Sequence, residues 1–308
     1  MTGSQVAVFW GQSTEELSDV CGSGDYDVVI MAFLTSLIPP KLNLGKDTGS
    51  ASTAQSQQDG WGLFDATVPG ASGTSVASQI SDCQSKGIKV LISFGGTTGI
   101  SDATLSSSDD AKTAADNLWN LFLGGTSMQD LRPFGTDVVL DGVDLDNETG
   151  DGSNYDTFLS TLTGYFGSDT SKSYYISADP MCSQVDAGDS TSIPKSVMKY
   201  INFMNVQFYN DDSNELGASN FESNIQAWDA LFSSVSPSPK LVVAIPGGKG
   251  AADTTNSNPV DIQDADQIKS SISTIKGMGL KNLGGVAIWD AGYAANNTGF
   301  SAAVKGAL

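Results

Sequence analysis

Residues 138–150 read VVLDGVDLDNETG, an apolar strand-like run that carries four acids, Asp141, Asp144, Asp146 and Glu148. Side chains alternate along a strand, so the last three of these acids share one face, and they are spaced about 7 Å apart. The apolar residues between them occupy the other face. Such a strand fits a fold in which one face meets packed helices and the other face meets a polar interior.

Working outward from this segment, the sequence repeats the same kind of run eight times, with helix-compatible stretches between most of them. The strand-like runs are QVAVFW (5–10), YDVVIMAFL (26–34), IKVLISF (88–94), DVVLDGVDLD (137–146), YYISA (174–178), INFMNVQFY (201–209), KLVVAI (240–245) and GGVAIW (284–289). The helix-compatible stretches are 75–86, 111–123, 154–166, 191–199, 221–234 and 261–278.

This alternation predicts the α/β class and a (β/α)8 TIM barrel, with one domain over residues 1–308. A doubly wound open sheet is the alternative. Segment 39–73, rich in Ser, Gly, Gln and Asp, is expected to be a long loop after the second strand, on the face where barrel enzymes build their sites.

In a barrel, Val143 and Leu145 suit the helix-facing side of the acidic strand, so the acids point into the lumen and Glu148 lies nearest the C-terminal mouth. Converging carboxylates in a partly dry lumen cannot all stay ionised, so at least one pKa should rise. The strand then holds a protonated acid that can donate a proton. An exposed acidic edge strand and a calcium site are the alternatives. The flanking apolar run disfavours the first, and the spacing lacks the glycine and later Glu of a helix-loop calcium site.

Composition excludes several classes of function. The chain has 308 residues, 35 Asp and Glu against 15 Lys and Arg, a net charge of −20 and no histidine. This charge disfavours nucleic acid and anionic membranes as partners, and no apolar run approaches the roughly 18 residues that span a bilayer. Without histidine there is no Ser-His-Asp triad, and the commonest zinc ligand is missing. We expect neither metal nor cofactor.

The motif DGVDLDNE (141–148) resembles the DGxDxDxE signature of family 18 glycoside hydrolases. Further stretches, in the same order along the chain, resemble the plant and fungal class III chitinases of that family. They are VAVFWGQ (6–12), CQSKGIKVLISFGG (83–96), LWNLFLGG (118–125), VQFYN (206–210) and GGVAIW (284–289).

The resemblance implies a retaining endo-glycosidase that cleaves β-1,4 bonds after N-acetylglucosamine in chitin or its oligosaccharides. The substrate's own 2-acetamido carbonyl attacks the anomeric carbon and forms an oxazolinium intermediate. By resemblance, Glu148 is the general acid and then the base, and Asp146 orients the acetamido group. Asp144 shares a proton or hydrogen bond with Asp146, and Tyr209 hydrogen-bonds the acetamido oxygen. Asp141 lies off the catalytic face and is expected to be structural.

The resemblance also implies a substrate pocket in which Trp289 forms an apolar floor beneath the sugar. The other expected lining positions are Gln207, Met204, Phe33, Gly95, Gly96 and Asp179. Three residues depart from the family pattern: Phe9 replaces a usual Tyr, Asn147 replaces a bulky apolar residue, and Asp179 replaces a small Ala. Asp179 would add a fourth inward acid, so these departures bear on substrate preference and pH optimum.

Three cysteines occur in the chain. Cys21 and Cys83 stand at positions that resemble a family disulfide, which implies an oxidising compartment. Cys182 resembles a second half-cystine whose partner is absent, so we expect a free buried thiol. The expected localisation is extracellular, with no signal peptide in this sequence, and the expected state is a monomer.

Two other functions are compatible with the same residues. An endo-β-N-acetylglucosaminidase that cuts the chitobiose core of N-glycans needs the same acetamido chemistry. A non-catalytic carbohydrate-binding or inhibitor protein on the same fold is the alternative from a different class. The expected partner is a glycan substrate that contains N-acetylglucosamine.

Overall fold

Eight strands pair in parallel and close into a ring in the computed structural model, which describes residues 3–45, 54–70, 72–97, 102–252 and 263–308. The strands are β1 (Gln5–Trp10), β2 (Val28–Leu37), β4 (Lys89–Gly96), β5 (Gly142–Asn147), β6 (Tyr175–Ala178), β7 (Phe203–Gln207), β8 (Lys240–Pro246) and β9 (Leu283–Trp289). Their order is β1-β9-β8-β7-β6-β5-β4-β2, and β1 also pairs with β2. This closure confirms the TIM barrel and rules out the open sheet.

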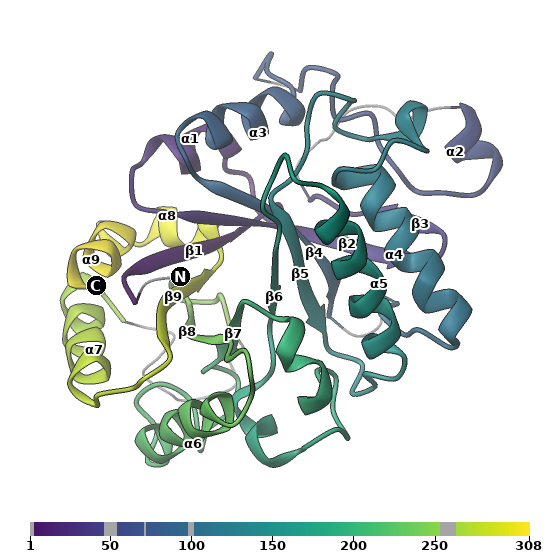
Figure 1. Ribbon diagram of the computed structural model, residues 1–308. Coiled ribbons are helices and arrows are strands. Elements are labelled where there is room, and N and C mark those ends of the chain that lie inside the picture. Colours follow the sequence, from purple (N-terminus) through teal and green to yellow (C-terminus); the bar gives the residue numbers. More distant parts are fainter. Residues whose placement is uncertain (1–2, 46–53, 71, 98–101, 253–262) are drawn as a thin grey trace.

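Helices lie around the outside of this ring (Figure 1). They are α1 (Leu17–Gly22), α2 (Ala54–Gln58), α3 (Val76–Ser85), α4 (Ser108–Phe122), α5 (Tyr155–Ser168), α6 (Phe221–Ser233), α7 (Ala265–Gly277), α8 (Ala291–Asn296) and α9 (Phe300–Ala307). Three 3-10 turns, η1 (Gln129–Leu131), η2 (Cys182–Asp186) and η3 (Lys195–Tyr200), complete the described elements.

All eight predicted strands are present, and the differences lie in the helices and loops: α1, α8 and α9 were not predicted, and one predicted helix is absent. The predicted helix 191–199 is wrong, because only the 3-10 turn η3 forms there, directly after Pro194. A proline disfavours helical backbone at the residue before it, so an α-helix that runs through this position is disfavoured. Residues 261–262 of the predicted helix 261–278 lie outside the described residues, and α7 begins after Asp264, which forms a capping box with Gln267.

The predicted loop 39–73 contains two short elements that sequence reasoning missed. One is β3 (Pro40–Leu42), which pairs antiparallel with β2, and the other is α2. Residues 46–53 and 71 of this segment lie outside the described residues.

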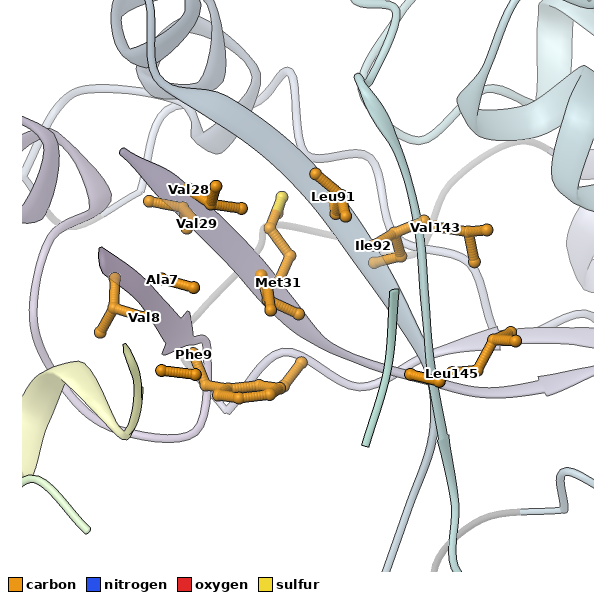
Figure 2. Packing of buried hydrophobic residues seen from close by; sticks show 14 of the residues in the cluster. Ala7, Val8, Phe9, Val28, Val29, Met31, Leu91, Ile92, Val143 and Leu145 are labelled. Carbon is orange, nitrogen blue, oxygen red and sulfur yellow. The ribbon is translucent and has the colours of Figure 1, made fainter. Parts of the chain in front are cut away.

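Packing on the outer side of β5 fixes the direction of the acids. Leu145 pairs in register with Phe94 of β4, and the Phe94 ring packs edge-on against Phe158 of α5, with ring centroids 6.1 Å apart. Val143 and Leu145 are fully buried among the apolar side chains of the neighbouring strands (Figure 2). Because side chains alternate, the residues between them point into the barrel.

The disulfide expected by resemblance is present: Cys21 of α1 is bonded to Cys83 of α3 and closes a sequence separation of 62 residues. The third cysteine, Cys182, is a free buried thiol, as predicted. Burial, together with the charge of Asp211, raises the pKa of this thiol well above its ordinary value. A thiol with that pKa is a poor nucleophile.

Replacing both Cys21 and Cys83 by alanine is expected to lower the free energy of unfolding by about 4 kcal/mol, because a cross-link over a loop of this length restricts the unfolded chain. Chemical denaturation with and without a reductant measures this loss. The reductant should destabilise the wild type and leave the double variant unchanged; equal stabilities of the two proteins would contradict the prediction.

Candidate active site

Strand register brings Asp144 between two serine hydroxyls. Asp144 of β5 is level with Ser93 on β4 and with Ser177 on β6. The Ser93 hydroxyl donates to Asp144 Oδ2 over 2.7 Å, and the Ser177 hydroxyl donates to Oδ1. The carboxyl is fully buried, so these donors replace the water that it loses. Burial still raises the pKa of Asp144, and the hydrogen bonds from Asp179, Ser177 and Ser93 oppose that rise.

Asp146 and Glu148 are linked by the side chain of Gln207 on β7. Gln207 Nε2 donates to Asp146 Oδ1 over 3.3 Å and to the backbone oxygen of Asp179 over 3.0 Å. Gln207 is also hydrogen-bonded to Glu148. The amide therefore fixes the spacing of the two acids at the C-terminal end of β5.

Electrostatics in this site favour retained protons. Burial, followed by the charges of Glu148 and Asp144, raises the pKa of Asp146 well above its ordinary value. Burial also raises the pKa of Glu148, although the hydrogen bond from Gln207 opposes this. Glu148 is the less buried of the two and sits one residue beyond the end of β5. Burial thus favours the protonated form of both acids, and Glu148 is the one that lies at the mouth of the barrel.

Tyr209 follows β7 on the same inward face as Gln207 and is 8% exposed. Burial raises the pKa of its phenol well above the ordinary value, and the charges of Asp146, Asp179, Glu148 and Asp144 add to this rise. The hydroxyl is therefore a neutral hydrogen-bond donor at acidic and neutral pH.

Asp179 interacts with Asp144 and Asp146, so it is the fourth inward acid that was expected. It follows the last residue of β6, is 4% exposed, and its backbone N–H donates to Leu145 O over 3.0 Å. Asp179 Oδ1 accepts a hydrogen bond from Asn205 Nδ2 over 2.8 Å. The side chain is enclosed and does not line the cavity beside Trp289, in contrast to the lining position that was expected for it.

An aromatic wall stands at the end of β9. The Trp289 ring is stacked on Phe33 of β2, with centroids 5.7 Å apart, and meets the edge of Phe9 of β1 at 5.5 Å. The rings of Trp289 and Phe33 border a cavity of about 110 Å³. The residues that line it are Gln12, Phe33, Thr35, Asn43, Gly95, Gly96, Thr97 and Trp289. A flat ring beside polar groups is suited to the apolar face of a sugar.

The two glycines that end β4 are required by close neighbours. A Cβ at Gly95, which has a φ of +127°, would lie 2.0 Å from the backbone oxygen of Asp146. A Cβ at Gly96 would lie 3.1 Å from the ring of Phe33. Both glycines therefore allow β5 and Phe33 to pack closely against the end of β4. Both also line the cavity, where the sequence analysis expected them.

The structure separates Met204 from the other expected pocket residues. Met204 alternates with Asn205 and Gln207 along β7, so it lies on the opposite face of the strand, where it is fully buried. Sequence reasoning in turn missed Asn205, Ser93 and Ser177. Asn205 has the same strand parity as Gln207, which was a usable signal; the two serines depend on strand register, which a single sequence does not reveal.

Asn147 faces away from the acids, as predicted, and it shapes the loop after β5. Its Nδ2 donates to the backbone oxygens of Asp151, over 2.8 Å, and Ser192, over 3.2 Å. Asp141, at the other end of the strand, accepts from the Val90 N–H and the Gln84 amide, each over 2.9 Å, which confirms its structural role.

Within the described ranges, no group of three or more His, Cys, Asp or Glu side chains is arranged to hold a metal ion. Over the same residues, no helix combines the length and apolar character that crossing a bilayer requires.

Comparison with known proteins gives one consistent picture. The sequence model of Glycosyl hydrolases family 18 matches residues 5–274. Endochitinase 3 of Metarhizium robertsii is 36% identical over 310 residues, which cover 99% of this chain and 91% of the relative. The crystal structure of ICChI chitinase from Ipomoea carnea is 30% identical, with a TM-score of 0.74, and covers 99% of this chain and 100% of its own. The xylanase and alpha-amylase inhibitor protein XAIP-II from Scadoxus multiflorus is 27% identical, with a TM-score of 0.74 and 98% coverage of both chains.

Replacing Asp146 by asparagine is expected to stabilise the fold increasingly as pH rises. The folded-state pKa of Asp146 lies well above the ordinary 3.8, so its contribution to stability is complete below 3.8 and is lost as pH rises through the folded value. Asparagine carries no charge and loses nothing over that range. Thermal unfolding of both proteins between pH 4 and pH 8 measures the difference.

The matched control is Asp109→Asn, which removes one negative charge from a side chain that is 95% exposed. Its unfolding temperature should track that of the wild type. A difference between Asp146→Asn and the wild type that did not grow with pH would show that Asp146 is ionised in the folded protein at all these pH values.

Proposed function

The chain belongs to Glycosyl hydrolases family 18, and we propose that it is a retaining endochitinase whose acid is Glu148 and whose nucleophile is the 2-acetamido group of the substrate. As a family member with endochitinase relatives, it is a chitinase-like glycoside hydrolase. The observation that carries the finer proposal is the row of acids on one face of β5, which ends in Glu148 at the mouth of the barrel with a raised pKa.

Glu148 donates its proton to the glycosidic oxygen while the bond from that oxygen to the anomeric carbon breaks. The carbonyl oxygen of the acetamido group attacks the anomeric carbon from the other face and closes an oxazolinium ring. The Glu148 carboxylate then takes a proton from water, which attacks the same carbon and reopens the ring. Two inversions leave the configuration retained, and burial of Glu148 supplies the raised pKa that the first step requires.

Asp146 accepts the hydrogen bond of the acetamido N–H. Burial and the charge of Glu148 make it costly for both carboxyls to be ionised at once, so the pair keeps a proton at mildly acidic pH. With substrate bound, that proton resides on Glu148, and the negative charge of Asp146 stabilises the oxazolinium. The neutral phenol of Tyr209 donates to the acetamido oxygen and orients it for attack.

Trp289 forms the apolar surface under the sugar at the cleavage point. Its contacts with Phe9 and Phe33 hold the ring at the end of β9, so that the surface exists before substrate arrives. Phe33, Gly95 and Gly96 line the same cavity as Trp289. Gln207, which is hydrogen-bonded to Asp146, is proposed to contact the sugar from the side of the acids.

The substrate is proposed to be chitin or its oligosaccharides, because the relative from Metarhizium robertsii bears the name endochitinase. An endo-β-N-acetylglucosaminidase would use the same acids with a different glycan outside the cleavage point. The likeness to XAIP-II keeps a non-catalytic inhibitor role open to test. The complete set of Asp144, Asp146, Glu148 and Tyr209 supports the enzyme.

The protein is proposed to work as a monomer outside the cell. The Cys21–Cys83 disulfide supports an oxidising compartment, and the net charge of −20 suits a neutral glycan better than nucleic acid.

Glu148→Gln is expected to lower kcat for chitopentaose by about 10²–10⁴-fold, since glutamine keeps the shape of the acid without its proton. Mass spectrometry of the products, with a high-mannose glycopeptide as the second substrate, measures cleavage by the wild type and the variant. The β-1,4-linked pentamer of glucosamine, which is chitopentaose without its acetyl groups, is the matched control substrate and should stay intact, because it lacks the internal nucleophile.

Release of a glycan that leaves one N-acetylglucosamine on the peptide would move the assignment to the N-glycan enzyme. Binding of chitopentaose without cleavage of either substrate would favour the non-catalytic protein. Cleavage of deacetylated oligomers would contradict the participation of the acetamido group.

Trp289→Ala is expected to raise KM for chitopentaose about tenfold, because it removes the apolar surface that the sugar covers. Trp289→Phe keeps a flat ring, so its KM should lie between those of the wild type and the alanine variant. Initial rates over a range of chitopentaose concentrations give kcat and KM separately. An unchanged KM in the alanine variant would mean that the sugar does not bind against this ring.

A further inference from the structure

Asp144 and Asp179 are two buried carboxyl groups in direct contact. Asp144 is fully buried, Asp179 is 4% exposed, and each carboxyl is close enough to shift the pKa of the other. Two neighbouring carboxyl groups without water are costly to ionise together, so one of them is expected to keep a proton, and only a protonated carboxyl can donate a hydrogen bond to the other. The two groups come from adjacent strands, since Asp144 is on β5 and Asp179 directly follows β6.

The surrounding donors are divided unequally between the two groups. Both oxygens of Asp144 already accept a serine hydroxyl, from Ser93 and Ser177. Asp179 Oδ1 accepts from Asn205 Nδ2, but Asp179 Oδ2 is buried without a hydrogen-bond partner. The group with donors on both oxygens is the better place for the charge, and the oxygen without a donor is the better place for a proton.

We infer that Asp179 keeps the proton of this pair and acts as a positioning residue. Its protonated carboxyl donates a hydrogen bond to Asp144, which stays ionised beside Asp146. This inference rests on the proposed function where it concerns catalysis. The groups that face Asp179 are Asp144 and Asp146 from β5, Asn205 from β7 and Tyr209 after β7. The directions of the pKa shifts agree, because contact with Asp144 raises the pKa of Asp179 and the same contact opposes the rise at Asp144.

A proton on Asp179 and a charge on Asp144 would affect the acids that take part in the reaction. If Asp144 is held as an anion by three donors, it does not compete for the proton that Asp146 and Glu148 share. Its charge instead favours the protonated form of Asp146 in the free enzyme. Asp179 therefore extends the active pH range on the acid side, by keeping Asp144 ionised where a carboxyl in the same burial would take up a proton.

Two variants at one position separate the donor from the charge. Asp179→Asn replaces the protonated carboxyl by an amide that can still accept from Asn205 and donate to Asp144. Asp179→Ala removes the donor. In the pH profile of kcat/KM for chitopentaose, the alanine variant should move the acid limb up by about one pH unit, the usual size for losing such a hydrogen bond, while the asparagine variant keeps it.

A measurement without substrate tests the proton itself. In protein labelled with ¹³C at the aspartate side-chain carboxyl, the wild type should show a protonated signal at pH 6 that disappears in Asp179→Asn. Asp144, assigned from its own asparagine variant, should be ionised in the wild type and in Asp179→Asn, and should titrate at higher pH in Asp179→Ala.

A wild-type Asp179 signal that is ionised at pH 6, or a protonated signal that disappears in Asp144→Asn instead, would overturn the inference. If the wild type cleaves neither substrate, the proposed function fails and the carboxyl signals alone decide the proton assignment. Thermal unfolding confirms that each variant is folded before its signals are compared.

Discussion

The free-energy cost of burying negative charge governs the interior of this barrel. Asp144, Asp146 and Asp179 are almost completely enclosed, and an ionised carboxylate in such a place is stable only if donors replace its lost water. The strands meet this cost with Ser93, Ser177, Asn205 and Gln207, each of which points a donor at an acid or at the backbone beside it. Burial still raises the pKa of all three acids despite these donors, which favours protonated carboxyls. A protonated carboxyl is what the proposed acid catalysis requires.

The same constraint explains why polar residues occupy strands that are otherwise apolar. The outer faces pack as an ordinary core, with Leu145 beside Phe94 and Phe158. The inner faces carry hydroxyl, amide and carboxyl groups that are level with one another across three or four strands. Function is therefore located where the pattern of the core is interrupted, at the carboxyl ends of parallel strands.

Much of this could be predicted from the sequence, because alternation within one strand is a local property. It placed the acids of β5 on one face and identified eight strands, and the motif order identified the family. Partners across strands were out of reach: Ser93 and Ser177 meet Asp144 only because of strand register, and Met204 was grouped with the pocket although alternation with Gln207 separates them. The turn η3 was missed for a local reason. A helix was predicted there from composition, although Pro194 disfavours helical backbone just before it.

Closure of the ring has a consequence for synthesis. Gln5 of β1 pairs with Gly285 of β9, so β1 waits for its second neighbour until all the other strands of the ring have been made. At typical elongation rates that delay is about 15–60 s. During it, β1 presents an unpaired edge to the crowded cell, and such edges recruit other strands. Synthesis of β9, which carries the Trp289 of the proposed sugar site, thus also ends the period in which the edge of β1 is unpaired.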